Sequence, residues 1–331
     1  MSTHVMSKVC IYGAGAIGGN LAARLARSGA DVSVVARGAH LDAIRQNGIT
    51  LESPKETIAA RVKASADPRD LGPQDLVIVT VKAPALPDVA AGIGPLLEPE
   101  TPVMFVMNGI PWWYFYRHGG PYDGRRLPRI DPGDAVWTAV GPQRAIGAVI
   151  YSANSVPRPG VVHNSNARAD LIIGEPSDEL TERVQNIAAL INASSATATI
   201  SPRIRDDVWN KLLGNMSSNP LTFLAQCSIK DMFAEPVCVA ALRRIAEEAA
   251  SIGRALGCNA HLDVDMAFGR NPSAHKPSIV QDLERGRPVE LDAMFTVPLE
   301  FAKMLNVPAP TLELLVALMT LRARGAGLYK A

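Results

Sequence analysis

The chain has 331 residues, longer than most single hydrophobic cores, so two domains are expected. Hydrophobic residues make up 47% of it and charged residues 20%, which is typical of a globular protein and excludes a disordered one. The 33 basic and 32 acidic side chains nearly cancel, so the chain offers no basic field for a polyanion, and nucleic-acid binding is disfavoured.

Cysteine usage and hydropathy favour an intracellular protein. Cys10, Cys227, Cys238 and Cys258 form no C-x-x-C pair, so we expect reduced thiols and neither disulfides nor a zinc site. The histidines show no ligand spacing, and no metal is predicted. No signal peptide precedes the first strand, and Glu313 breaks the nearest long apolar run, so we expect a soluble, cytoplasmic protein without a membrane segment.

The first third of the chain alternates strand-like and helix-like segments. Continuous, β-branched apolar runs occur at 8–12, 31–36, 75–81 and 102–107, as in strands buried on both faces of a parallel sheet. Between the first two, the segment 20–29 has helical apolar spacing and closes on a glycine. This alternation predicts an α/β fold with a Rossmann-like, doubly wound sheet.

A long loop rich in Gly, Pro, Arg and aromatic residues follows at 110–133. Strand-like signals then return and predict an antiparallel extension of the same sheet; they are DAVWTAV (134–140), AIGAVIYSAN (145–154), GVVHN (160–164) and ADLIIGE (169–175). A helix near 177–193 and a strand at 196–200 complete this domain. From about residue 204 the apolar spacing is helical, so we predict one domain with the Rossmann-like sheet over 1–201 and a helical domain over 202–331.

A glycine motif opens the first helix. Gly13, Gly15 and Gly18 form G-x-G-x-x-G directly after a strand, and with Ala16 and Ile17 they are predicted to bind a dinucleotide. The helix N-terminus would supply amide donors to the pyrophosphate. The alternative is a glycine turn with a purely structural role.

The end of the second strand indicates which dinucleotide is bound. NAD enzymes usually carry an acidic residue there, whereas this chain has Arg37, and a guanidinium suits a 2′-phosphate, so NADP(H) is favoured. The alternative is a solvated arginine. Lys82 and Asn108 also follow predicted strands, at the sheet edge where ligands of such folds bind, although a loop lysine is often only solvated.

Three polar residues recur at intervals of four at the start of the second domain. Lys211, Asn215 and Asn219 would share one face of a helix and form a substrate wall. Pro220 is expected to kink or interrupt that helix just after Asn219. The alternative is a polar stripe that faces solvent.

Taken together, these motifs resemble the ketopantoate reductase family, which reduces 2-dehydropantoate to pantoate with NADPH. The matching segments appear in the family's order and span nearly the whole chain: GAGAIGG, VTVKA, MNG, WNKLLGNMSSNPLT and KPSIVQDLERGRPVELD. The last two are the more specific, because many dehydrogenases share the glycine motif.

The resemblance implies a role for each matching residue. It implies Lys211 and Glu290 as catalytic residues, Asn215, Asn219 and Ser278 as substrate-binding residues, Asn108 at the interdomain cleft, Lys82 near the cofactor, and the glycines with Arg37 holding NADPH. A lysine with an ordinary pKa of about 10.4 is charged at neutral pH and can protonate the oxygen that gains charge during hydride transfer. Glu290 is expected in the first turn of a helix, where the dipole favours its carboxylate form, so we assign the proton to Lys211.

The loop at 110–133 departs from the family pattern. Five consecutive aromatic residues begin at Trp112 and predict either a wall beside the nicotinamide or a loop that packs on its own sheet or in a dimer interface. A wall would favour a bulkier 2-keto acid as the substrate. Two alternatives to ketopantoate reduction therefore stay open, a reductase of another 2-keto acid and a non-catalytic NADPH-binding sensor, and so does a homodimer.

Overall fold

The computed structural model describes residues 6–270 and 272–329, and the chain divides into two compact units. Unit 1 contains the residues up to 107 together with 111–204, and unit 2 contains 108–110 together with the residues from 205 onward. The division after residue 204 falls in the first turn of a long helix, close to the boundary that the sequence predicts between residues 201 and 202.

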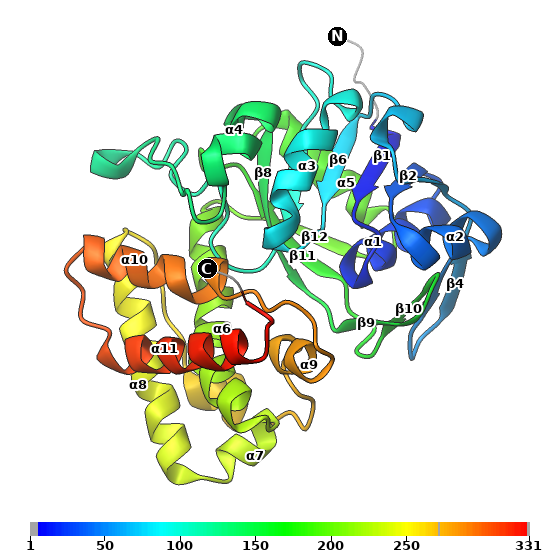
Figure 1. Ribbon diagram of the computed structural model, residues 1–331. Helices are drawn as coiled ribbons and strands as arrows, with labels where there is room; N and C mark the ends of the chain where they lie inside the picture. The colour runs from blue at the N-terminus through cyan, green and yellow to red at the C-terminus, as the bar shows by residue number, and fades with distance from the viewer. Residues whose placement is uncertain (1–5, 271, 330–331) are drawn as a thin grey trace. The chain divides into compact units, whose positions relative to one another are not determined.

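Unit 1 is built on an eight-stranded sheet in the order β12-β11-β8-β7-β6-β1-β2-β5 (Figure 1). Its strands are β1 (Lys8–Tyr12), β2 (Asp31–Val35), β5 (Lys63–Ser65), β6 (Leu76–Val79), β7 (Val103–Val106), β8 (Ala145–Tyr151), β11 (Asp170–Gly174) and β12 (Thr197–Ile200). Within this sheet β8 and β11 pair antiparallel and the other neighbours pair parallel. The doubly wound sheet with an antiparallel extension is confirmed.

A second, four-stranded sheet was not predicted. It has the order β4-β3-β10-β9 and consists of β3 (Ile49–Glu52), β4 (Thr57–Ala60), β9 (Asn154–Arg158) and β10 (Val161–Asn164). The expectation that GVVHN extends the main sheet is therefore wrong. Helix α1 (Ala16–Arg27) contacts strands of both sheets, and Leu21 and Leu25 of α1 share one apolar core with Ile49 and Val162 of the small sheet.

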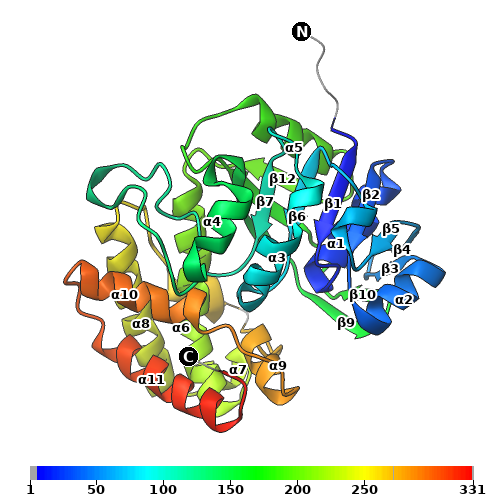
Figure 2. The same ribbon diagram turned by 45° about the horizontal axis from the view of Figure 1, so that its top comes forward.

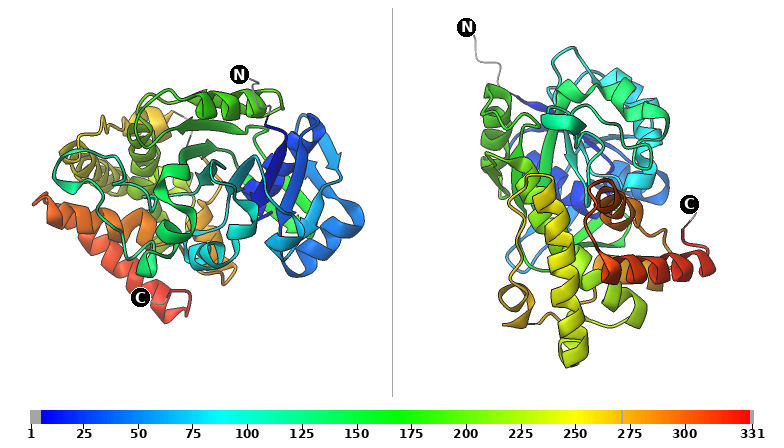
Figure 3. Two further views of the ribbon diagram at one scale, coloured as in Figure 1. Left: turned by 90° about the horizontal axis from the view of Figure 1, so that it is seen from above. Right: turned by 90° about the vertical axis from the view of Figure 1, so that its left-hand side faces the viewer.

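Helices cover both faces of the main sheet. Apolar side chains of α1 and α5 (Glu182–Asn192) join the core on one face, whereas α3 (Leu86–Gly92) and α4 (Ala135–Val140) contact each other in front of β6 and β7 (Figure 2). Seen from above, α5 and α3 lie on opposite sides of the strands (Figure 3). Helix α2 (Gly38–Asn47) follows β2.

DAVWTAV forms helix α4, so the strand expected there is wrong. The carboxylate of Asp131 accepts hydrogen bonds from the backbone N–H groups of Val136 (2.8 Å) and Trp137 (2.9 Å), in the first turn of the helix. These amides have no partner within the helix, so a carboxylate that satisfies them favours helix over strand.

The aromatic run after β7 packs on the sheet of its own unit. Trp112 and Trp113 are each 1% exposed, and Trp112 makes edge-to-face ring contacts with Phe105 of β7 (5.3 Å) and with Trp137 of α4 (5.9 Å). Gly147 of β8 makes room for Trp113, because a Cβ at residue 147 would lie 2.7 Å from the indole. Of the two roles that the sequence leaves open for this loop, the contacts favour packing.

Unit 2 is helical, as predicted. It contains α6 (Ile204–Ala225), α7 (Ile229–Phe233), α8 (Pro236–Ala255), α9 (Ser278–Glu284), α10 (Val297–Met304) and α11 (Pro310–Gly325), with π-helical turns η7 (Asp265–Gly269) and η8 (Asp292–Thr296). The long helix α8 and the C-terminal helix α11 cross each other (Figure 3, right). None of the helices in the described part of the chain is long and apolar enough to span a bilayer.

Pro220 does not interrupt helix α6, which continues to Ala225. The helix is anchored on both sides of the proline, because Trp209, Leu213 and Phe223 are fully buried. This tertiary packing outweighs the loss of one backbone hydrogen bond at Pro220.

Candidate functional site

In the glycine loop between β1 and α1, the fold itself requires glycine at residues 13 and 18. Gly13 has φ +103°, and a Cβ on it would lie 2.7 Å from Val81 Cγ1. A Cβ on Gly18 would lie 2.1 Å from the Gly13 carbonyl oxygen and 2.4 Å from Thr80 Oγ1. Close approach of helix to strand therefore excludes any side chain at residue 18.

Gly15 differs from both neighbours in the motif. It is the N-cap of α1 with φ −69°, and a Cβ there would meet no protein atom within 4 Å. The open space in front of this helix N-terminus is where a pyrophosphate would accept hydrogen bonds from backbone amides. The loop therefore fits a dinucleotide, because the fold does not require a glycine at residue 15 and a bound phosphate would.

Side chains from other elements hold the loop in place. Thr80 Oγ1 donates a hydrogen bond to the Gly13 carbonyl (2.5 Å). His40 Nδ1 accepts from the backbone N–H of Gly160 (3.0 Å), so Nε2 carries the ring proton and donates to the Ala14 carbonyl (2.6 Å). The loop is thus tied to β6 on one side and to the small sheet on the other.

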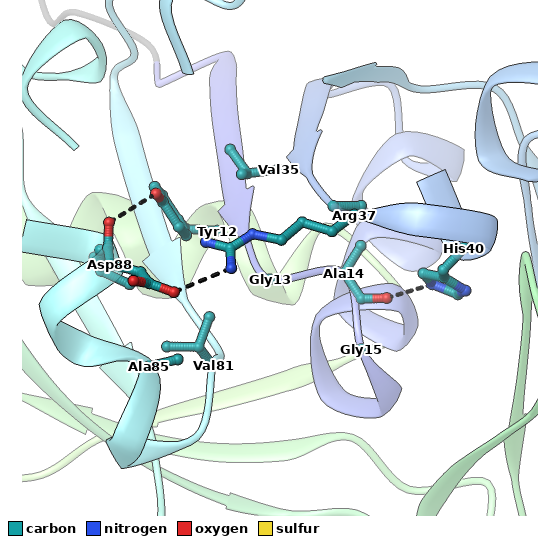
Figure 4. Close-up of a pocket in the computed structure, with 12 residues that line it drawn as sticks. Tyr12, Gly13, Ala14, Gly15, Val35, Arg37, His40, Val81, Ala85 and Asp88 are labelled. Carbon is teal, nitrogen blue, oxygen red and sulfur yellow. Dashed lines mark hydrogen bonds and ion pairs between the residues drawn. The ribbon is translucent and has the colours of Figure 1, made fainter. Parts of the chain in front are cut away.

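A cavity of about 260 Å³ lies beside this loop (Figure 4). It is lined by residues from the ends of β1 and β2, from the loop after β6 and from α3, namely Tyr12, Gly13, Ala14, Gly15, Val35, Ala36, Arg37, His40, Val81, Ala85, Asp88 and Val89. Arg37 reaches across it and forms an ion pair with Asp88, with 3.0 Å between Nη1 and Oδ2.

The structure gathers some of the predicted cofactor residues here and not others. Gly13, Gly15 and Arg37 line the cavity. Ala16, Ile17 and Gly18 form the first turn of α1 beside it. Lys82 is exposed before the short helix η2 (Ala83–Ala85) and is not part of the lining, and Asn108 belongs to unit 2.

Sequence reasoning missed Tyr12, His40 and Asp88. Asp88 lies in the first turn of α3 and not at the end of β6, so the sheet-edge rule that singled out Lys82 does not indicate it. No local pattern indicates that His40 would bond the Ala14 carbonyl, because the glycine loop and α2 meet only in the folded chain.

In unit 2, Lys211, Asn215 and Asn219 lie on α6, as their spacing predicts. Asn219 is 4% exposed and Lys211 is half-buried, so they do not form a solvent-facing polar stripe. Ser278 is the exposed first residue of α9.

Lys211 departs from an ordinary lysine. Burial lowers the pKa of its ammonium to about 8, against a smaller opposing effect of the Glu290 carboxylate, which raises it. The expectation of an ordinary lysine pKa is therefore wrong. A pKa near neutrality makes Lys211 a better proton donor than a solvated lysine, because the proton leaves more readily while most of the population still carries it.

Glu290 does not lie in the first turn of a helix, contrary to expectation. It lies in the irregular segment between α9, which ends at Glu284, and η8, which begins at Asp292. The helix stop at Gly286 is present, with φ +61°. The Glu290 carboxylate nevertheless acts electrostatically on the Lys211 ammonium and raises its pKa.

Asn108 follows β7 in the sequence but belongs to unit 2 with Gly109 and Ile110. The backbone N–H of Ile110 donates to the Ala293 carbonyl of η8 (2.8 Å). Gly109 has φ +85°, and a Cβ on it would lie 2.5 Å from that carbonyl, so only glycine allows this approach. Asn108 is therefore held beside the segment that follows Glu290.

The parallel sheet, the glycine loop and the adjoining cavity define unit 1 as a dinucleotide-binding domain of the Rossmann type. Residues 9–112 match the family described as ketopantoate reductase PanE/ApbA, and residues 203–323 match its C-terminal domain. The chain belongs to the ketopantoate reductase family.

Relatives extend this similarity over nearly the full length. A 2-dehydropantoate 2-reductase of Mesorhizobium japonicum is 41% identical over 97% of this chain and 99% of its own. A solved structure from Ralstonia solanacearum MolK2, described provisionally as a ketopantoate reductase, has 37% identity and a TM-score of 0.90, covering 98% of this chain and all of its own. D-mandelate dehydrogenase, solved with NADH and anilino(oxo)acetate, shares the fold with a TM-score of 0.82 at 18% identity, over 97% of this chain and all of its own.

These matches establish the class of reaction. The chain is an oxidoreductase of this family, and the family implies a nicotinamide cofactor.

Proposed function

We propose that the protein reduces 2-dehydropantoate to pantoate with NADPH and that Lys211 is the general acid. The observation that carries the proposal is the match of both parts of the chain to the ketopantoate reductase family. Lys211 and Glu290 lie in the same helical unit, where burial lowers the pKa of the lysine to about 8. The Mesorhizobium japonicum relative described above carries the name of this activity.

The chemistry requires a proton at one atom of the substrate. The reduced nicotinamide, when bound, supplies a hydride to the keto carbon. Negative charge then develops on the carbonyl oxygen, and the Lys211 ammonium stabilises that charge and donates its proton to the oxygen. A desolvated ammonium is effective here, because electrostatic interactions strengthen where water is excluded.

Glu290 contributes to the same site without supplying the proton. Its carboxylate raises the pKa of Lys211 and so keeps the lysine protonated at neutral pH. In the proposed complex it also accepts a hydrogen bond from the hydroxyl that forms.

The remaining predicted residues divide between substrate and cofactor. Asn108, Asn215, Asn219 and Ser278 are proposed to donate hydrogen bonds to the substrate, and a carboxamide does so without adding charge. For the cofactor we propose the glycine loop with Ala16 and Ile17, Arg37 as the cation for the 2′-phosphate, and Lys82 and Asn108 toward the nicotinamide.

Burial of the aromatic run favours ketopantoate over a bulkier keto acid. Trp112, Trp113, Tyr114 and Phe115 are each at most 1% exposed, so these rings are engaged in packing. Reduction of another 2-keto acid and cofactor binding without turnover remain the competing outcomes of the test.

The test follows the loss of reduced nicotinamide absorbance with ketopantoate and with a panel of other 2-keto acids. We expect ketopantoate to be turned over fastest and Lys211→Ala to lower kcat/KM by about a thousandfold while NADPH still binds, because general acids contribute roughly 10²–10⁴-fold. Lys230→Ala, at an exposed lysine of α7 in the same unit, is the matched control. Faster turnover of another keto acid would identify that acid, and not ketopantoate, as the substrate. NADPH binding without any turnover would favour a non-catalytic NADPH-binding sensor.

We also propose that the chain forms a homodimer through α11. Leu314, Leu318 and Leu321 are 61%, 42% and 65% exposed and lie on one face of this helix. Two such helices that pair antiparallel about a two-fold axis would bury the leucines of each copy against those of the other. Sedimentation should show a dimer that Leu318→Glu dissociates, and a monomer in the unmodified protein would refute the proposal.

A further inference from the structure

The ion pair between Arg37 and Asp88 occupies the region of the cavity where the adenosine ribose is expected. Arg37 stands at the end of β2 as the N-cap of α2, and Asp88 lies in the first turn of α3, so the pair bridges two elements across the cavity (Figure 4). The Arg37 guanidinium is therefore already engaged with a carboxylate on the opposite wall.

Asp88 is fixed through its backbone. The hydroxyl of Tyr12, at the end of β1, donates to the Asp88 backbone carbonyl (3.4 Å), and Tyr12 is only 4% exposed. Leu86 and Val89, on either side of Asp88 in α3, are fully buried. These contacts fix the backbone of Asp88, whereas its side chain is 58% exposed, close to the 66% of Arg37.

The two residues favour different adenosine nucleotides. A 2′-phosphate carries about −1.5 to −2 charges at neutral pH, so the Arg37 guanidinium attracts it. The Asp88 carboxylate, whose Oδ2 lies 3.0 Å from Arg37 Nη1, repels the same phosphate. A 2′-hydroxyl instead donates a hydrogen bond to a carboxylate, which is the interaction that NAD-dependent Rossmann enzymes obtain from an acid at the end of β2. This chain has Arg37 at the end of β2 and brings an acid, Asp88, from the facing helix.

We infer that Asp88 determines cofactor specificity, by weakening the binding of a 2′-phosphorylated dinucleotide and supporting the binding of one with a free 2′-hydroxyl. The chain then binds NADH as well as NADPH, with a preference smaller than Arg37 alone would give. This inference rests on the proposed nicotinamide site in unit 1 and does not depend on the identity of the keto acid.

The test is an equilibrium titration of the full chain with NADPH and with NADH, without keto acid, followed by quenching of tryptophan fluorescence. We expect Asp88→Asn to raise the ratio of NADPH affinity to NADH affinity by about fivefold at low salt, since an exposed ionic interaction changes an equilibrium constant by up to about that factor. The gain should shrink at about 0.5 M salt, because screening acts on exposed charges. Asp42→Asn, at an exposed aspartate of α2 that does not line the cavity, controls for net charge and should leave the ratio unchanged.

Arg37→Gln separates this role from a positioning role. If Asp88 acts on the 2′-phosphate, Asp88→Asn should still raise the affinity ratio when Arg37 is already Gln. A lower NADPH affinity in Asp88→Asn alone would overturn the inference, because it would mean that Asp88 orients Arg37 for the phosphate. An unchanged ratio with both cofactors binding would also overturn it, and so would binding of NADPH without any binding of NADH. Failure of both cofactors to bind the unmodified chain would instead refute the proposed function itself.

Discussion

The two charged sites, one in each unit, differ in how far water reaches their charges. At the dinucleotide cavity the side chains of Arg37 and Asp88 are 66% and 58% exposed, and they interact with each other in a high-dielectric environment. In the helical unit, burial lowers the pKa of Lys211 by more than the nearby Glu290 carboxylate raises it.

The difference indicates that the exposure of a charged group determines which function it suits. An exposed pair costs little to form and little to break, so it suits recognition of a ligand that must replace one of the partners. A desolvated ammonium destabilises its own charged form, which brings its pKa toward neutrality and suits proton transfer. The following predictions test this contrast.

The largest effect is expected in the glycine loop, where backbone and not charge forms the site. Gly18→Ala places a Cβ 2.1 Å from the Gly13 carbonyl oxygen, so we expect a loss of about 3 kcal/mol in the free energy of unfolding. Gly15→Ala meets no protein atom within 4 Å, so its thermal stability should stay unchanged while cofactor affinity falls about tenfold. Denaturation and cofactor titration of both variants check this, and equal destabilisation of the two would contradict it.

Lys211→Met is expected to stabilise the fold by about 2 kcal/mol at pH 7, although it abolishes catalysis. The pKa of Lys211 falls from 10.5 to about 8 on folding, so the unfolded chain holds this proton more tightly than the folded chain. The buried ammonium therefore lowers the free energy of unfolding. This loss is complete below about pH 8 and disappears as the pH rises from there to 10.5. Urea denaturation at several pH values should show the gain of the variant at pH 7 and its loss above pH 10.5. A variant that is less stable at pH 7 would show that Lys211 is not desolvated.

Glu290→Gln should shift the alkaline limb of the rate profile. With Lys211 as the proposed general acid, turnover should fall as the pH rises through about 8. Because the Glu290 carboxylate raises the pKa of Lys211, its removal should move this limb to lower pH. The pH dependence of kcat/KM measures the shift, with Glu284→Gln, an exposed glutamate of α9, as the control. An unchanged alkaline limb would show that Glu290 does not affect the pKa of Lys211.

The sequence predicted those elements of the fold that depend on residues close to one another in the chain. The strands β1, β2, β6 and β7 carry continuous apolar runs because both of their faces are buried, and the run therefore identifies them. DAVWTAV has equally strand-like residues but forms α4, because Asp131, which precedes the run, caps its first amides. GVVHN forms a strand as expected and pairs with the neighbouring strand β9. Its other partner, β3, is far away in the sequence, so no local pattern indicates that GVVHN joins the small sheet.

The candidate sites divide in the same way. The glycine motif and the spacing of Lys211, Asn215 and Asn219 are local and could be predicted. The lowered pKa of Lys211 could not, since it depends on which groups surround the ammonium after folding. The pairing of Arg37 with Asp88 also joins residues that meet only in the folded unit, and it changes what Arg37 alone implies about the cofactor.

The smallest effect is expected for the stability of Asp88→Asn. Both partners of the ion pair are more than half exposed, so the pair should contribute at most about 0.5 kcal/mol to folding, and the melting temperature should stay within about 2 °C of that of the unmodified chain. The same substitution is expected to change cofactor selectivity about fivefold, because it removes the repulsion between the Asp88 carboxylate and the charge of about −1.5 to −2 on a 2′-phosphate. Thermal denaturation without cofactor measures the first quantity. A large drop in melting temperature would show that the pair is structural, and the contrast between an exposed ion pair and a buried lysine would then not hold.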